Sequence, residues 1–138
     1  MPDLLHFALT ALVILGGQQD WRRREVSNWI TIPLFLLGLA GAAGWWLCGH
    51  LPIPALAILS FLLFWRLGWL GGADVKILAG LWGLWPLGGL AAILGLGLWG
   101  LLAILLRRSP SIRIPGVVAM AFATGLTFLL EIAIMPSN

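Results

Sequence analysis

The sequence has very little charge for its length. Of its 138 residues, only 9% are Asp, Glu, Lys or Arg, whereas 61% are hydrophobic. A water-soluble domain ordinarily carries about 25% charged residues, because its surface has to be hydrated. The composition therefore excludes a small soluble domain and predicts one domain, residues 1–138, that is an all-α polytopic membrane protein.

Cysteine is almost absent, since Cys48 is the only one. A single thiol cannot form an internal disulfide, and the sequence has no paired-cysteine motif of the kind that binds zinc. We expect neither a metal nor another cofactor. The net charge of +3 does not indicate a nucleic-acid partner, because the basic residues fall in short clusters between apolar segments, as they do in membrane proteins that contact lipid.

Six apolar segments approach the length of about 20 residues that a helix needs to cross a bilayer. The uncharged stretch 77–106 would be about 45 Å long as one helix, which is too long for a single crossing. Pro86, followed by Gly88 and Gly89, predicts a turn that divides it. The expected spans are residues 4–19, 29–48, 52–69, 74–85, 87–106 and 115–134.

The basic residues predict the orientation of these spans. With six spans, every Lys and Arg falls on one side of the membrane, and a positive bias marks that side as cytoplasmic. A multi-pass protein of the inner membrane with both termini outside follows. Tryptophans near the span ends, Trp85 among them, are expected at the membrane interfaces. The basic residues are Arg22, Arg23, Arg24, Arg66, Lys76, Arg107, Arg108 and Arg113.

The same topology sorts the five carboxylates. Asp3 and Glu131 belong to the outer side, whereas Asp20, Glu25 and Asp74 belong to the cytoplasmic side. An aspartic protease needs two carboxyl groups close enough to share a proton. One takes a proton from water, and the other donates a hydrogen bond to the carbonyl of the substrate. Asp20, at the end of the first span, and Asp74, at the start of the fourth, are the candidate pair.

Each acid alone also has an ordinary structural interpretation. Asp74 follows Gly71 and Gly72, which permit tight turns and close backbone approach, and an acid is favoured at the start of a helix. Asp20 could belong to a solvated loop. Acids this close to a span are nevertheless uncommon and often functional. The alternative to a protease is a small non-enzymatic transporter or channel subunit with the two acids as a proton or cation site.

Three motifs resemble those of prepilin peptidases, also called type IV leader peptidases. Residues 71–76 (GGADVK) are similar to the GxGDxK signature of that family, and residues 20–28 (DWRRREVSN) to its first aspartate motif. Residues 112–115 (IRIP) resemble the segment that leads into its last span. Ala73 replaces the second glycine of the signature, and Ser27 stands where proline is usual.

The resemblance implies an intramembrane aspartic endopeptidase. It would cleave the basic leader from a type IV prepilin or pseudopilin at the cytoplasmic membrane boundary, with water as the nucleophile. The larger members of the family also methylate the new N-terminus and carry an insertion with cysteine pairs. This sequence lacks such an insertion, so we expect cleavage without methylation. In this it resembles the short members that serve tight-adherence pili. The catalytic residues would be Asp20 and Asp74, with support from Gly71, Gly72, Ala73, Lys76 and Asn28.

The roles of Lys76 and Asn28 have two interpretations each. Lys76 lies two residues after Asp74, about 200° around a helix, so the two side chains do not face each other. Snorkelling of Lys76 to the headgroups is favoured over a role in shaping the surroundings of Asp74. Asn28 either caps the second helix or orients the site. Arg22, Arg23 and Arg24 are expected to fix topology and to bind anionic lipid.

Overall fold

The computed structural model describes residues 4–23, 25–105 and 116–134. Over these residues the chain forms helices and no strand, which confirms the all-α class. Some of the predictions concern residues outside this part of the chain: Asp3, Arg24, Arg107, Arg108, Arg113 and residues 112–115. The helices are α1 (Leu4–Arg23), α2 (Asn28–Leu47), α3 (Ile53–Arg66), α4 (Gly72–Leu84), α5 (Pro86–Leu105) and α6 (Gly116–Ile134).

The predicted division of the long apolar stretch at Pro86 is confirmed. Helix α4 ends at Leu84, and Trp85 leaves the helical conformation with φ −147° and ψ 82°. Pro86 is then the first residue of α5. Proline suits this position, because the first N–H of a helix has no intrahelical partner and the ring fixes a helical φ.

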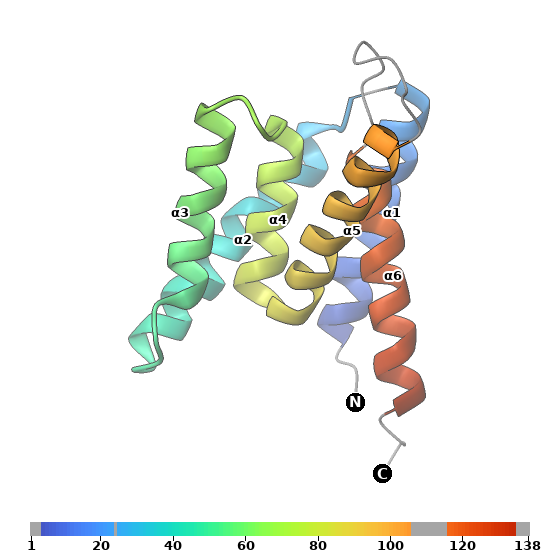
Figure 1. Ribbon diagram of the computed structural model, residues 1–138. Coiled ribbons are helices and arrows are strands. Elements are labelled where there is room, and N and C mark those ends of the chain that lie inside the picture. Colours follow the sequence, from blue (N-terminus) through green and yellow to red (C-terminus); the bar gives the residue numbers. More distant parts are fainter. Residues whose placement is uncertain (1–3, 24, 106–115, 135–138) are drawn as a thin grey trace.

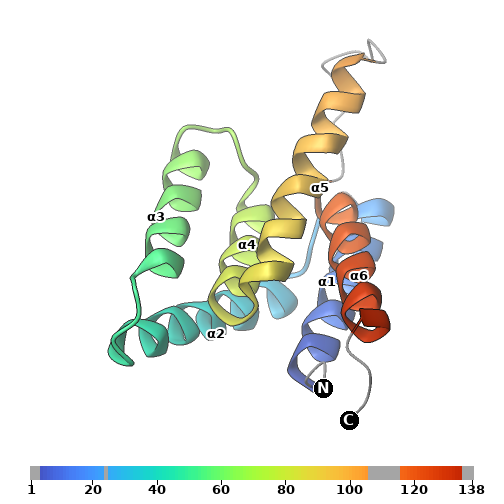
Figure 2. The ribbon, with the colours of Figure 1, turned by 60° about the horizontal axis from the view of Figure 1, so that its bottom comes forward.

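Successive helices run in opposite directions, so that both termini lie at the same end of the bundle (Figure 1). Helix α4 packs against α2, α3 and α5, while α6 packs against α1 and α5. Figure 2 shows α1 and α6 side by side, away from α3. The connections from α1 to α2 and from α3 to α4 lie at the end opposite the termini (Figure 1). This alternation agrees with the order of spans expected from the sequence.

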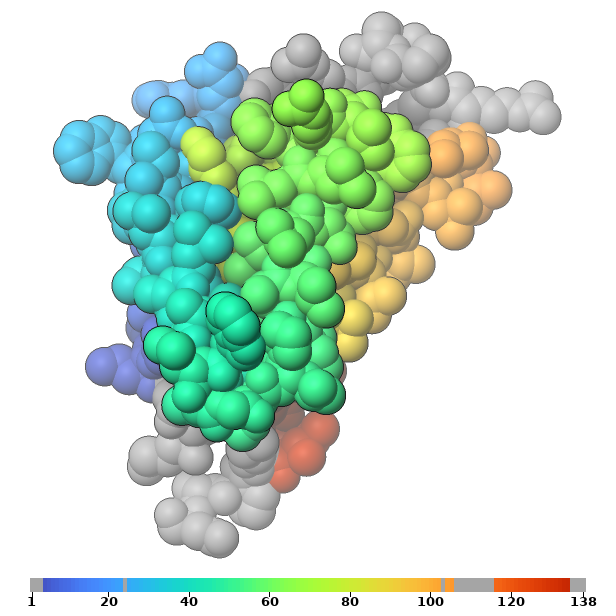
Figure 3. All heavy atoms as spheres, turned by 90° about the vertical axis from the view of Figure 1, so that its left-hand side faces the viewer, coloured from blue at the N-terminus to red at the C-terminus, as the bar shows by residue number. Residues whose placement is uncertain are grey.

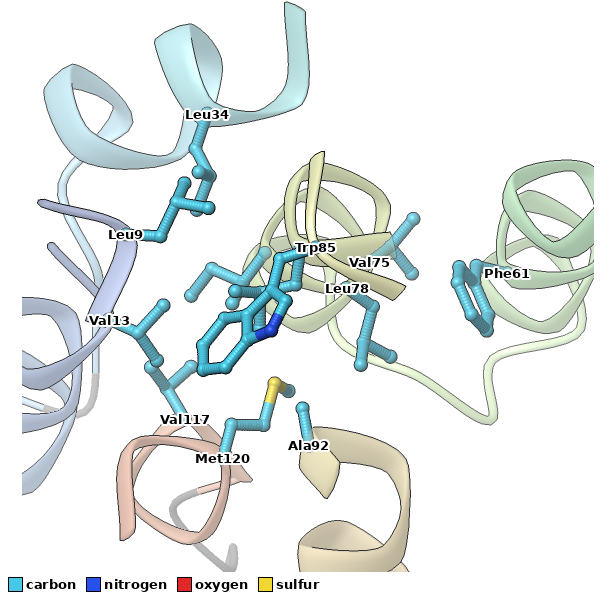
Figure 4. Packing of buried hydrophobic residues seen from close by; sticks show 12 residues of the cluster. Leu9, Val13, Leu34, Phe61, Val75, Leu78, Trp85, Ala92, Val117 and Met120 are labelled. Carbon is cyan, nitrogen blue, oxygen red and sulfur yellow. The ribbon is translucent and has the colours of Figure 1, made fainter. Parts of the chain in front are cut away.

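The main core of the bundle is a cluster of buried apolar side chains drawn from every described helix (Figure 4). Trp85, at the junction of α4 and α5, lies among them and is only 3% exposed. The expectation that Trp85 lies in an interface belt is therefore wrong. The labelled members are Leu9 and Val13 of α1, Leu34 of α2, Phe61 of α3, Val75 and Leu78 of α4, Trp85, Ala92 of α5, and Val117 and Met120 of α6.

Helices α2 and α4 touch through their backbones. A Cβ atom at Gly38 would overlap the backbone of α4, and one at Gly83 would overlap the backbone of α2. A Cβ at Gly80 would likewise overlap Leu34. Small residues permit this close approach, which in lipid supplies the packing energy that hydrophobic burial supplies in water. The contact fixes the position of α4, and α4 carries Asp74.

The outer surface of the bundle is strongly apolar. By length and composition, α2 and α6 could each cross a membrane, whereas α3 and residues 86–102 of α5 are shorter apolar helices. The face over α2 and α3 is the one turned to the viewer in Figure 3. Leu37 of α2 and Leu59 of α3 are 53% and 62% exposed. These features suit contact with lipid; the number of crossings and the side on which the termini lie stay predictions.

Candidate active site

Asp20 and Asp74 come from different helices to the same end of the bundle. Asp20 lies in the last turn of α1, and Asp74 is the third residue of α4. Both meet the start of α6. The Val117 N–H donates to Asp20 Oδ2 at 3.1 Å, and a Cβ at Gly116 would lie only 2.9 Å from Asp74 Oδ1. The two carboxyl groups are near enough to interact electrostatically.

The carboxylate of Asp74 folds back onto the start of its own helix. Its Oδ2 accepts a hydrogen bond from the Gly71 N–H at 3.2 Å, as an acid at this position does in a capping box. A Cβ at Gly71 would lie 2.9 Å from that oxygen. Gly71 therefore provides the space that this rotamer of Asp74 occupies. The interpretation of Asp74 as a helix-start acid accounts for its contact with Gly71 but not for its approach to Gly116.

The rest of the glycine-rich segment has ordinary backbone geometry. Gly71 is extended, with φ −71° and ψ 153°, and the described glycines with positive φ are Gly49 and Gly68. Ala73 lies inside α4, in the conformation that alanine favours most. A Cβ at Gly72 would make ordinary contact, at 3.7 Å, with Trp65 Nε1. Alanine in place of glycine at position 73 is thus compatible with the geometry that presents Asp74.

A second pair of residues fixes the chain beside Asp20. The Ser27 N–H donates to Gln19 Oε1 at 2.9 Å, which ties the start of α2 to the last turn of α1. Ser27 has φ −61°, a value that proline would also adopt, but proline has no N–H to donate. Gln19 was not singled out in the sequence. Its position directly before Asp20, at the end of an apolar segment, is the signal that could have indicated it.

Lys76 and Asn28 contact each other. Lys76 Nζ donates to Asn28 Oδ1 at 2.9 Å, although the residues are 48 positions apart. Ser27, and not Asn28, is the N-cap of α2, with its side chain accepting from the Trp29 N–H. The lysine thus links α4 to the start of α2. The roles of Lys76 and Asn28 toward the two acids stay predictions.

The three sequence motifs do not include the residues of α6 that contact the two acids. Gly116 and Val117 follow the segment that resembles the lead into the last span, and neither was predicted to take part. Their signal is weak, because a glycine after Pro115 and a valine in an apolar span are common features. Only the packing of α6 against α1 and α5 brings them to Asp20 and Asp74.

Glu131 of α6 and His6 of α1 lie away from this site. Glu131 lies near the far end of α6, where its Oε1 accepts from Trp85 Nε1 at 3.0 Å. Its Oε2 is 3.3 Å from His6 Nδ1, and the His6 ring stacks on Trp85 with centroids 4.7 Å apart. The separation of Glu131 from Asp20, predicted from the topology, is confirmed. Among the residues described, no group of three His, Cys, Asp or Glu could hold a metal ion.

An apolar groove runs between α1 and α6 beside the site. It encloses about 640 Å³. Gln18 and Trp21, on either side of Asp20 in the sequence, line it at one end, and Leu129 lines it toward the other. A second apolar groove, of about 590 Å³, lies between α5 and α6. Helix α6 therefore has a groove on each side and meets the two acids at its first turn.

Comparison with known proteins identifies the family. A family model described as the type IV leader peptidase family matches residues 7–130. The chain belongs to the type IV leader peptidase family. No curated protein and no solved structure matches it. The resemblance to this family is confirmed, and the match extends from the first helix to the last.

Membership of the type IV leader peptidase family has direct consequences. It identifies a peptidase and supports a prepilin peptidase role with a substrate of the prepilin type. Together with the apolar helices, it indicates a membrane protein. The match contains Asp20, Asp74 and the first residues of α6, so every part of the site described above belongs to the region that the family shares.

Proposed function

We propose that the chain is an intramembrane aspartic endopeptidase of prepilin-like proteins. Asp20 and Asp74 activate the water that cleaves the basic leader, at the cytoplasmic boundary of the inner membrane. One observation supports this most. Asp20 on α1 accepts a hydrogen bond from Val117, and Asp74 on α4 lies close to Gly116, so the two acids meet the first two residues of α6. Family membership supplies the reaction class.

The proposed chemistry needs two carboxyl groups in different protonation states. Neighbouring carboxyl groups repel as anions, so they share a proton and titrate as a pair. The ionised group takes a proton from water, and the resulting nucleophile attacks the scissile carbonyl. The protonated partner donates a hydrogen bond to the carbonyl oxygen and stabilises the charge that develops there. The C–N bond of the tetrahedral intermediate then breaks, and the carboxyl group that took the proton from water gives it to the leaving amine nitrogen.

The basic residues near the site support the position of the cut. Arg22 and Arg23 end α1, Arg66 ends α3 and Lys76 lies in α4, all at the end of the bundle that holds the two acids (Figure 1). Positive charge is concentrated at cytoplasmic ends of membrane helices. A site at that boundary meets a substrate whose polar leader stays in the cytoplasm and whose following segment is an apolar helix.

The proposed activity is cleavage alone. Methylation in the family goes with paired cysteines, whereas this sequence contains the single Cys48. Prepilins of the tight-adherence type are the substrates that we would test first, because the sequence resembles the short family members that serve tight-adherence pili.

Cleavage in cells tests the proposal. The chain is co-expressed with a candidate prepilin, and leader removal is followed by the size of the pilin. Asp20→Asn and Asp74→Asn should each lower cleavage about 10²-fold to 10⁴-fold, the usual contribution of a positioned acid or base. Glu131→Gln is the matched control at the other end of α6 and should cleave normally. Persistent cleavage by either aspartate variant would contradict the paired-acid mechanism.

A topology reporter tests the orientation separately. A reporter fused after Ser137 should report the outer side of the membrane, since six crossings return the chain to the side on which it began. A cytoplasmic signal would contradict six spans and the placement of the site at the cytoplasmic face.

A further inference from the structure

We infer that the first turn of α6 is a third part of the catalytic site. In this inference, which rests on the proposed function, Gly116 and Val117 are positioning residues that set the relative placement of Asp20 and Asp74. Val117 does so by donating a backbone hydrogen bond, and Gly116 by having no side chain.

The Val117 N–H is well suited to hold the Asp20 carboxylate. The first N–H groups of a helix have no partner within it, and the end of the helix carries a partial positive charge that favours an anion. The side chain of Val117 is 1% exposed and packs in the core that Figure 4 shows. Its Cγ1 lies 3.5 Å from the position of a Cβ at Gly16 of α1. The donor is therefore fixed relative to the helix that carries Asp20.

Gly116 leaves room for the second acid. A Cβ there would lie 2.9 Å from Asp74 Oδ1, 3.2 Å from Asp74 Oδ2 and 3.0 Å from Leu96 Cδ2. The carboxylate cannot withdraw without losing its hydrogen bond to the Gly71 N–H. A side chain at position 116 would therefore push Asp74 away from its present position, or push α6 away from α4.

The two contacts join residues that are remote in the sequence. Asp20 and Val117 are 97 positions apart, and Asp74 belongs to a third helix. Since Gly116 and Val117 are consecutive, one helical turn contacts both acids. A shift of this turn changes the distance between the carboxyl groups, and reactions between positioned groups are sensitive to such shifts.

The first experiment compares two variants of α6, each of which adds a single methyl group. Gly116→Ala introduces the contacts with Asp74, whereas Gly125→Ala is the matched control, because a Cβ at Gly125 meets nothing within 4 Å. A misplacement of about 1 Å costs about 100-fold in rate. We expect Gly116→Ala to lower kcat by about that factor with KM and the midpoint of thermal unfolding unchanged, and Gly125→Ala to cleave like the wild type.

The second experiment removes the hydrogen-bond donor. Val117→Pro lacks the N–H, and proline is tolerated in the first turn of a helix, while Val117→Ala truncates the buried side chain but keeps the donor. We expect kcat of Val117→Pro to be about tenfold below that of Val117→Ala, because a hydrogen bond from a backbone N–H to a charged carboxylate is among the stronger hydrogen bonds in proteins. If Gly116→Ala does not accumulate as folded protein, the comparison of Val117→Pro with Val117→Ala still tests the inference.

Three results would overturn the inference. The first is equal cleavage by Gly116→Ala and Gly125→Ala. The second is a loss of activity that only follows a loss of thermal stability. The third is equal kcat in the proline and alanine variants at position 117. Failure of the proposed function looks different, since Asp20→Asn or Asp74→Asn would then still cleave. If both aspartate variants are inactive and the α6 variants are normal, the inference alone is wrong.

Discussion

The two ends of α6 hold acids in different ways. At its start, Asp20 and Asp74 accept hydrogen bonds from backbone N–H groups, those of Val117 and Gly71. Near its other end, Glu131 contacts side chains, with Oε1 on Trp85 and Oε2 on His6. Backbone groups fixed in helix starts can hold a carboxylate at a set position while chemistry occurs. A carboxylate with a side chain on each oxygen is instead suited to joining helices.

The comparison separates two tasks that one bundle performs. The end with Glu131 ties α6 to α1 through His6 and to the α4–α5 junction through Trp85. That tie helps to hold α6 in place, and the position of α6 determines what its first turn contacts. Changes at the far end should therefore affect stability, whereas changes at the start should affect cleavage.

Removal of the Trp85 side chain should have the largest effect on stability. The indole is 3% exposed, and its loss leaves a cavity and an unpaired Glu131 oxygen. Trp85→Ala should lower the free energy of unfolding by about 3–5 kcal/mol, measured by thermal or denaturant unfolding in detergent. Trp46→Ala is the matched control, because Trp46 is 63% exposed. An equal loss in both variants would contradict the assignment of Trp85 to the core.

Loss of the contact between Lys76 and Asn28 should have an effect of intermediate size, and the property affected should be cleavage. Lys76→Met and Asn28→Ala should each lower cleavage about threefold to tenfold, because one hydrogen bond that positions α4 is removed. The double variant should be no worse than the singles, since residues in contact are not additive. Arg66→Met, which removes a cation at the same end, is the control. Additive losses would contradict a role for the contact.

Glu131→Gln should have the smallest effect. The amide oxygen can still accept from Trp85 Nε1, and only the charge that faces His6 is lost. We expect a decrease of about 1 kcal/mol or less in the free energy of unfolding, with cleavage within about twofold of the wild type because the acid is remote from the proposed chemistry. A large loss of cleavage at unchanged stability would show that the two ends of α6 do not have separate tasks.

Much of the fold could be predicted because its signals are local. Pro86 divides a stretch that is too long to cross once, and the observed helices follow the expected spans within a few residues. The alternation of helices then places Asp20 and Asp74 at one end and Glu131 at the other. The burial of Trp85 could not be predicted in this way. Tryptophan usually prefers an interface because of its N–H group, but here Glu131, 46 positions away, satisfies that group inside the bundle.

The sequence by itself determined the class of the molecule, the order of its helices and the two acids that belong to one end. These follow from composition, charge and helix-ending residues, whose effects are short in range. Only the tertiary structure decided how the acids are held. Gly71 leaves space for Asp74, Gln19 fixes the turn beside Asp20, and Gly116 and Val117 meet both carboxyl groups. Such contacts depend on the distance and angle between helices, which are set by the packing of all the described helices together.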